Sequence, residues 1–94
     1  MRGPVAIVLL GCLLAACATE QMAVEREKAD SHYNLGIARL ASGDARQAIG
    51  EFSQAIGDAS DNSAYHNALG LAYLVDRRPD LAIDVCAEAL GRPA

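Results

Sequence analysis

The sequence predicts an all-α fold, in which two helix-turn-helix repeats stack as a short α-solenoid. Three observations support this prediction: a repeat with a period of 34 residues, a composition rich in alanine, and turn segments at matching places in the two copies. When residues 29–60 are placed over residues 63–94, nine of the 32 pairs are identical. A fixed period of this size is typical of stacked helical repeats.

The identical pairs are mostly small or apolar residues at helical spacing, as packed helices require. They are His32/His66, Leu35/Leu69, Gly36/Gly70, Ala38/Ala72, Leu40/Leu74, Ala48/Ala82, Ile49/Ile83, Ala55/Ala89 and Gly57/Gly91. Two antiparallel helices in each repeat predict helices over residues 30–42, 45–57, 63–76 and 80–90. The domain boundaries follow as a repeat region over 29–94, divided into 29–62 and 63–94.

The turns between these helices contain residues that favour helix ends and starts. Asp44 follows Gly43 and is expected to cap the second helix. In the second copy this glycine is missing, but Pro79 stands where a helix can begin. A polar break separates the repeats at Asp61, Asn62 and Ser63.

Small residues stand where helix axes must approach to within roughly 8–10 Å. They are Gly36, Ala48, Ala55, Gly70, Ala82 and Ala89. The spaces between the helices are expected to be filled by Leu35, Phe52, Ile56, Leu69, Tyr73 and Leu90. Cys86 is expected to be a buried free thiol, since free cysteine packs as a small hydrophobe. The alternative is an intermolecular disulfide in an oxidising compartment.

The charge of the chain argues against nucleic-acid binding, and its size limits it to one small domain. The chain of 94 residues has 8 basic and 12 acidic side chains, a net charge of −4. Without residues 1–16 it keeps 7 basic and 12 acidic side chains, a net charge of −5. Nucleic-acid binding is therefore not expected, because it needs a basic surface. With 19 alanines, four aromatic residues and no tryptophan, the chain has material for one small domain only.

The first sixteen residues are predicted to be a signal peptide. A positive start at Arg2 precedes an uncharged apolar stretch that ends in small residues. Leu14-Ala15-Ala16-Cys17 resembles the bacterial lipobox, which implies cleavage before Cys17 and lipidation of its thiol. The alternatives are an ordinary secretory signal with a chance cysteine, and a second frame that ends at Cys12 but leaves a stunted apolar region.

This lipoprotein resemblance implies several acyl chains, palmitate among them, on Cys17. Two or more chains hold a protein on a membrane stably, at about 0.8 kcal/mol for each buried methylene. Ala18 follows the cysteine in place of the aspartate that commonly retains lipoproteins at the inner membrane. The expected location is the outer membrane, facing the periplasm. Residues 17–28 then serve either as a charged tether or as a backward extension of the first repeat helix.

The 34-residue period, with Leu35-Gly36 early in the repeat and Ala48 and Ala55 later, resembles the tetratricopeptide repeat. Members of that family usually bind a peptide or a protein helix in a concave groove, which the first helix of each repeat lines. The matching positions here are Asp30, Tyr33, Ile37, Leu40, Ala41, Ala64, Asn67, Leu71, Leu74 and Val75. For Leu40 and Leu74, packing between helices is an equal alternative. The carboxylate clamp of chaperone-binding repeats is absent, because Tyr33 and Ile37 occupy its first positions.

No pattern in the sequence indicates an enzyme, a cofactor other than the lipid on Cys17, or a metal site. His32 and His66 occupy equivalent positions, but the family places a large packing side chain there. A metal-binding or redox protein that uses these histidines and Cys86 is the less favoured alternative.

Arrays of this kind usually end in a capping helix. The sequence stops before one, so Leu81, Val85 or Leu90 is expected to be partly uncovered. Either the chain is a truncated member, or this edge docks on another copy or on a partner. The combined features resemble tetratricopeptide lipoproteins that assist assembly of type IV or Flp pili and their secretins. The expected function is thus a non-catalytic scaffold, and the alternative is an adaptor that recruits cell-wall enzymes.

Overall fold

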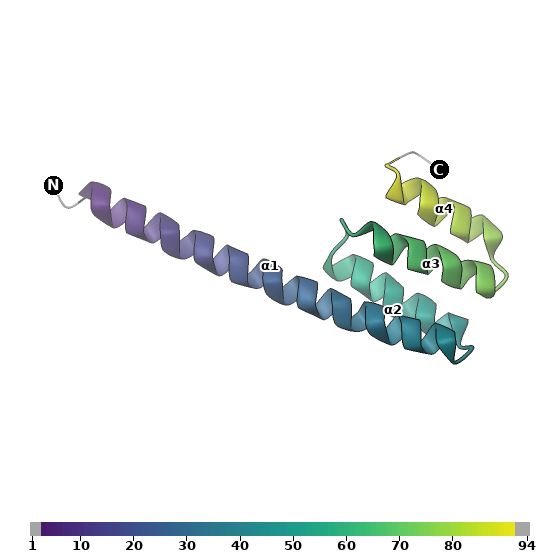
Figure 1. Ribbon diagram of the computed structural model, residues 1–94. Helices are drawn as coiled ribbons and strands as arrows, with labels where there is room; N and C mark the ends of the chain where they lie inside the picture. The colour runs from purple at the N-terminus through teal and green to yellow at the C-terminus, as the bar shows by residue number, and fades with distance from the viewer. Residues whose placement is uncertain (1–2, 92–94) are drawn as a thin grey trace.

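Four α-helices make up the described part of the computed structural model, residues 3–91, and no strand occurs there. Side chains are described at residue 17 and residues 19–91. Consecutive helices pack against each other, as Figure 1 shows for α2, α3, α4 and the C-terminal half of α1. The helices are α1 (Gly3–Ala41), α2 (Ala45–Asp58), α3 (Ser63–Val75) and α4 (Pro79–Ala89). The predicted all-α repeat fold is confirmed, and apart from the start of α1 the predicted bounds differ by one residue at most.

The first helix begins well before the repeat region and projects beyond the other three helices (Figure 1). Residues 17–28 belong to this helix, so the chain there forms the backward extension of the first repeat helix. Met22 and Val24 on the extension are exposed. The signal peptide predicted for residues 1–16 lies outside the residues whose side chains are described. In the described part of the chain, no helix has the length and apolar character that a membrane crossing requires.

Both repeats turn between their helices through the same backbone motif. Gly43 has a φ of 86°, and the hydrogen bonds Gly43 N–H to Leu40 O and Asp44 N–H to Arg39 O close the end of α1. Thirty-four residues later, Arg77 has a φ of 63° and the equivalent bonds close the end of α3. This is the Schellman arrangement, in which glycine is the favoured left-handed residue. The second repeat therefore forms the turn with a residue that adopts this backbone less readily.

Side chains at the helix starts satisfy free backbone N–H groups. The Asp44 carboxylate accepts a hydrogen bond from Gln47 N–H at 3.1 Å, which confirms the predicted cap of α2. The Asn62 side chain accepts from Ala64 N–H at 2.9 Å at the start of α3. Helix α4 begins with Pro79 as predicted, and its cap residue Arg78 makes no such side-chain bond. Sequence-local chemistry thus explains where α2, α3 and α4 begin.

The main core lies between α1, α2 and α3 and reaches the inner side of α4. Its buried residues are Ala48, Phe52, Ala68, Leu69, Ala72 and Val85. A second cluster of Ala29, Ala55 and Tyr65 joins the two repeats. Alanine supplies half of the first cluster and two of the three residues of the second, so the helices approach closely around the single phenylalanine. Phe52 has no exposed surface.

Gly36 lets α1 close on Phe52. A Cβ atom at position 36 would lie 2.5 Å from Phe52 Cε1 and 2.7 Å from its Cδ1, closer than carbon atoms pack. At the equivalent position of the second repeat, a Cβ on Gly70 would lie 3.4 Å from Cys86 Sγ. The small residue is therefore required in the first repeat and merely tolerated in the second.

Three expectations about the core were wrong. Leu35 and Leu90 do not fill the spaces between helices but are exposed, because no helix of the described chain covers the outer sides of α1 and α4. Cys86 is exposed rather than buried for the same reason. Of Leu81, Val85 and Leu90, one of which was expected to be partly uncovered, Val85 is buried against the core because it points toward α3. Leu81 is half-buried, and the exposure predicted for Leu90 as an end residue is confirmed.

Candidate protein-binding surface

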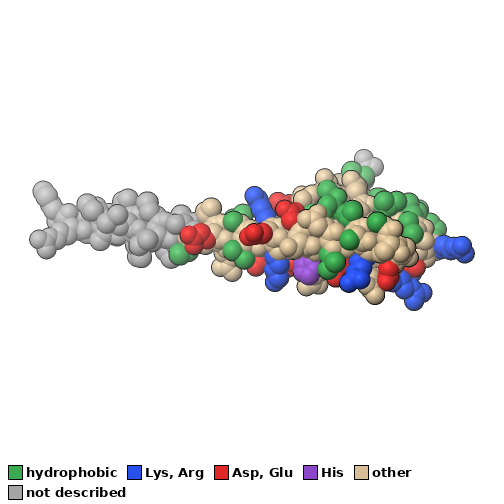
Figure 2. Space-filling model, turned by 60° about the horizontal axis from the view of Figure 1, so that its bottom comes forward, with side chains coloured by type: hydrophobic (Ala, Val, Ile, Leu, Met, Phe, Trp, Pro, Cys, Tyr) green, Lys and Arg blue, Asp and Glu red, His purple; other side chains and the backbone are tan. Residues whose placement is uncertain are grey.

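Four of the predicted groove residues are branched apolar side chains that are exposed to solvent. They are Ile37 on α1 and Leu71, Leu74 and Val75 on α3, with exposed fractions between 43% and 55%. All four belong to the predicted groove set. In Figure 2 hydrophobic side chains gather along one edge of the repeat region, whereas charged side chains concentrate along the opposite edge. We call Ile37, Leu71, Leu74 and Val75 the apolar strip. Exposed apolar surface of this kind is typical of binding surfaces.

The other predicted groove residues divide into exposed and half-buried positions. Asp30, Ala41, Ala64 and Asn67 are exposed, whereas Tyr33 and Leu40 are half-buried. Leu40 packs against the main core, so of the two leucines considered for helix packing, Leu40 packs and Leu74 is exposed. The surface available to a partner is therefore centred on α3, with Ile37 as its main contribution from α1.

Tyr33 lies between the rings of Phe52 and Tyr65. Its ring centroid is 5.8 Å from that of Phe52 and 5.2 Å from that of Tyr65, and both pairs are tilted. Such aromatic pairs stabilise a fold by about 0.5–1.5 kcal/mol beyond the area that they bury. Tyr33 therefore packs where both core clusters meet, which limits how much of its ring a partner can contact.

Asp30 is engaged within the molecule. The Tyr65 hydroxyl donates a hydrogen bond to Asp30 Oδ1, which joins the second repeat to the first. This hydrogen bond, with the burial of the ring and the negative charge of Asp30, raises the pKa of Tyr65 above its ordinary value of 10.0. At neutral pH the hydroxyl stays protonated and remains a donor. Asp30 thus links the two repeats through this hydrogen bond and is also exposed to solvent.

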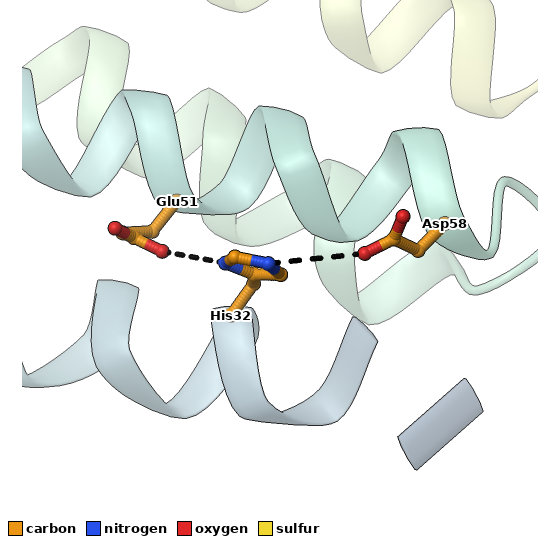
Figure 3. A network of polar contacts seen from close by, with 3 residues as sticks. All are labelled: His32, Glu51 and Asp58. Carbon is orange, nitrogen blue, oxygen red and sulfur yellow. Dashed lines mark hydrogen bonds and ion pairs between the residues drawn. The ribbon is translucent and has the colours of Figure 1, made fainter. Parts of the chain in front are cut away.

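His32 connects α1 to two carboxylates of α2 (Figure 3). Its Nδ1 lies 2.7 Å from Glu51 Oε2, and its Nε2 lies 3.9 Å from Asp58 Oδ2. A neutral imidazole donates from one nitrogen only, whereas a protonated ring donates from both. His66, at the equivalent place in the second repeat, instead has Nε2 3.0 Å from the Ser60 carbonyl.

The two histidines therefore have separate partners, and each supports local helix packing. Among the described residues, no group of three or more His, Cys, Asp and Glu side chains is arranged to hold a metal ion. The structure does not bring Cys86 into a cluster with either histidine.

Sequence reasoning did not find a hollow beside the extension of α1. It lies where the extension passes the loop between α2 and α3, and its walls combine both charges with apolar atoms. The lining residues are Gln21, Met22, Glu25, Arg26, Asp58, Ala59 and Asp61. No motif marks this place, because its two walls come from segments more than thirty residues apart. Cys17, the predicted lipidation site, lies on the same helix and is exposed.

A comparison with known protein families supports the repeat interpretation. The family described as "Tetratricopeptide repeat" matches residues 33–94, about two thirds of the chain. Neither the curated proteins nor the solved structures include a significant match. The matched segment contains both turns, the Phe52 core and the apolar strip, and it agrees with the 34-residue period and the stacked helix pairs. The chain therefore belongs to the tetratricopeptide-repeat family.

Proposed function

We propose that the chain is a non-catalytic scaffold that binds another protein through the apolar strip. Tetratricopeptide repeats are in general protein-interaction modules, and the strip is the observation that carries the proposal for this chain. Ile37, Leu71, Leu74 and Val75 keep about half of their surface in water, whereas Leu69 on the same helix as three of them is 7% exposed. Covering them with apolar atoms is favourable by about 25 cal/mol for each Å².

The chemistry of the strip favours an apolar helix or extended peptide as the partner. Its four members have no charge, and Asn67 is the exposed amide beside them that can form a hydrogen bond. A partner with leucine or aromatic anchors at spacings of three and four residues would match the spacing of Leu71, Leu74 and Val75 on α3. A partner recognised mainly by its carboxylate would lack a basic counterpart there.

The same proposal places the chain on the periplasmic face of the outer membrane, attached through lipid on Cys17. Support comes from the Leu14-Ala15-Ala16-Cys17 motif and from Ala18 after it. Cys17 is exposed, as an acylated thiol must be. Eleven residues, 18–28, separate it from the repeat region, so an anchored copy would present the strip at a distance from the lipid. No other cofactor is part of this proposal.

Within the envelope, the proposed role is assembly of a pilus or secretin machine. The support is the combination of a lipobox with short tetratricopeptide repeats, which resembles lipoproteins that serve such machines. An adaptor that recruits cell-wall enzymes has the same two features and is the second candidate. The identity of the protein bound at the strip separates the two candidates.

Affinity capture from solubilised envelopes tests the strip. Wild-type chain, Leu71→Glu and Gln54→Glu are compared as baits, and bound proteins are identified by mass spectrometry. Gln54 is an exposed residue of α2 outside the strip. Gln54→Glu therefore adds the same negative charge at a position that is not expected to contact the partner. We expect one partner to be lost with Leu71→Glu and kept with Gln54→Glu. Equal capture by all three baits would contradict binding at the strip.

Metabolic labelling with palmitate tests the anchor. Cys17→Ser is expected to abolish the label and to release the protein from membranes, whereas Cys86→Ser keeps both. Persistent labelling of Cys17→Ser would exclude lipidation at this residue. Metal analysis of the purified chain tests the metal-binding alternative, which stoichiometric zinc or copper would favour.

A further inference from the structure

The repeat stack has two outer sides that the described chain leaves uncovered. On α4, Ile83, Cys86 and Leu90 form a row at spacings of three and four residues, and we call this row the α4 end. Ile83 is 69% exposed and Leu90 is 71% exposed. On α1, Leu35 and Ala38 are exposed one helical turn apart, and we call this pair the α1 end.

The interior of the molecule shows what covers such positions. Within the chain, α2 packs against α3, and the two helices share the main core. The residues of α2 that correspond to Ile83, Cys86 and Leu90 are Ile49, Phe52 and Ile56, which are all buried or half-buried. The α4 end is therefore a second copy of a surface that, one repeat earlier, is covered by a helix.

The α1 end is the other half of the same interface. Leu69 and Ala72 are the residues of α3 that correspond to Leu35 and Ala38. Leu69 is 7% exposed and Ala72 is fully buried, whereas Leu35 is 41% exposed. The difference arises because α3 has the preceding repeat beside it and α1 does not. Among the described residues, both halves of the internal repeat interface therefore recur on the outside of the stack without a helix to cover them.

Charge also favours a contact between the two ends. Asp80, Asp84 and Glu88 form an exposed acidic row beside the α4 end. Lys28 and Arg39 are exposed on the same side of α1 as Leu35, seven residues before it and four residues after it. Opposite charges along the two rims direct one end toward the other. A contact between two α4 ends would instead bring two acidic rows to one interface.

We propose that a second copy of this chain docks its α1 end on the α4 end, so that copies continue the repeat stack head to tail. The contact follows the packing of α2 on α3, with Leu35 of one copy between Ile83 and Leu90 of the next. Such an interface is heterologous, so dimers retain one free α1 end and one free α4 end and can grow further. This inference does not rest on the lipid anchor or on the apolar strip.

Cross-linking of the full chain in non-ionic detergent tests the contact. All variants carry Cys12→Ser and Cys17→Ser, so that Cys86 is the remaining native thiol, and a short bismaleimide joins neighbouring thiols. Leu35→Cys is expected to give dimers and a ladder of higher products, because position 35 then meets Cys86 of a second copy. Ile37→Cys is the matched control, since its residue is on the same helix and is 43% exposed but lies on another side.

Two results would overturn the proposal. One is a dimer yield from the variant with Cys86 as its remaining thiol that equals the yield from Leu35→Cys. This result would place two α4 ends together. The other is a Leu35→Cys yield no higher than that of Ile37→Cys, which would leave the α1 end without a contact.

Charge variants give an independent measurement through light scattering of the same full chain. Leu35→Glu and Leu90→Glu should each return the protein mass to the monomer value of 9.8 kDa. Mixed in equal amounts, they should form a dimer, because each variant keeps the end that the other has lost. Self-association of Leu35→Glu alone, or a monomeric wild-type chain at millimolar concentration, would contradict the head-to-tail contact. Partner capture at the strip is measured separately, so failure of one proposal does not imply failure of the other.

Discussion

The two repeats share one backbone plan but differ in how tightly their helices close. In the first repeat, Phe52 packs on Gly36 and has no exposed surface. In the second, Cys86 stands in place of Phe52, is exposed, and leaves Gly70 with ordinary contacts. The tightest packing of the fold therefore lies between α1, α2 and α3. The outer side of α4 is consequently open to further contacts.

Removing the aromatic ring should give the largest difference between the repeats. Phe52→Ala is expected to lower the free energy of unfolding by about 3–5 kcal/mol, because it leaves a cavity between three helices. Cys86→Ala should change it by less than about 1 kcal/mol, since the thiol is exposed. Urea unfolding followed by circular dichroism measures both. Equal effects would show that the two repeats close in the same way.

Filling the glycine positions should give the next largest difference. Gly36→Ala forces a methyl group against the Phe52 ring and should destabilise the chain by about 1–3 kcal/mol. Gly70→Ala meets Cys86 Sγ at 3.4 Å and should be neutral or stabilising by up to about 1 kcal/mol, because alanine favours a helix over glycine. Urea unfolding measures both variants. If Gly70→Ala destabilised the chain as much as Gly36→Ala does, the claim that the helices of the second repeat pack less tightly would be wrong.

The junction between the repeats should respond to alkaline pH. Because the folded state raises the pKa of Tyr65, its protonated hydroxyl stabilises the fold fully below pH 10, and this contribution is lost as pH rises above 10. Tyr65→Phe should lower stability by about 1 kcal/mol at neutral pH, through loss of the hydrogen bond to Asp30. The gap between wild type and variant should narrow above pH 10. If the difference in unfolding free energy between wild type and Tyr65→Phe stayed constant above pH 10, the hydrogen bond at the junction could not be its source.

The two turns should give the smallest difference. Arg77→Gly is expected to stabilise the chain by about 0.5–1 kcal/mol, because glycine adopts the positive φ of this position without strain. Gly43→Arg, the reverse change in the first repeat, should destabilise it by a similar amount. Thermal melts of the two variants measure both effects. The melting temperature should rise for Arg77→Gly and fall for Gly43→Arg.

Much of the fold could be predicted because its determinants are local in sequence. The 34-residue period and the residues Gly43, Asp44 and Pro79 predicted the bounds of the repeat helices to within one residue, except for the start of α1, which was expected at residue 30 and lies at Gly3. The burial of individual side chains could not be predicted in the same way. Leu35 and Leu69 are identical residues at equivalent positions, yet one is exposed and the other buried. The position of each repeat in the stack decides whether its leucine is buried, and no local sequence pattern indicates that position.

The candidate site was predictable as a set of positions, but less so in its details. The family register placed Ile37, Leu71 and Val75 on the surface that the structure exposes. It did not show that Tyr33 packs between two rings, because this depends on Phe52 and Tyr65 from two other helices. It also did not show that His32 binds carboxylates of α2 while His66 contacts a carbonyl group. Such contacts depend on side chains in which the two copies differ.

Site-specific photo-cross-linking in intact cells tests most directly whether the apolar strip binds a protein. A photoreactive phenylalanine analogue is placed at Leu71 in the strip and, as a control, at Gln54 on α2. We predict one discrete adduct from position 71 that is absent from position 54 and is reduced at least tenfold when Val75→Glu is added. No adduct from position 71, or the same adduct from both positions, would contradict a protein-binding strip on α1 and α3.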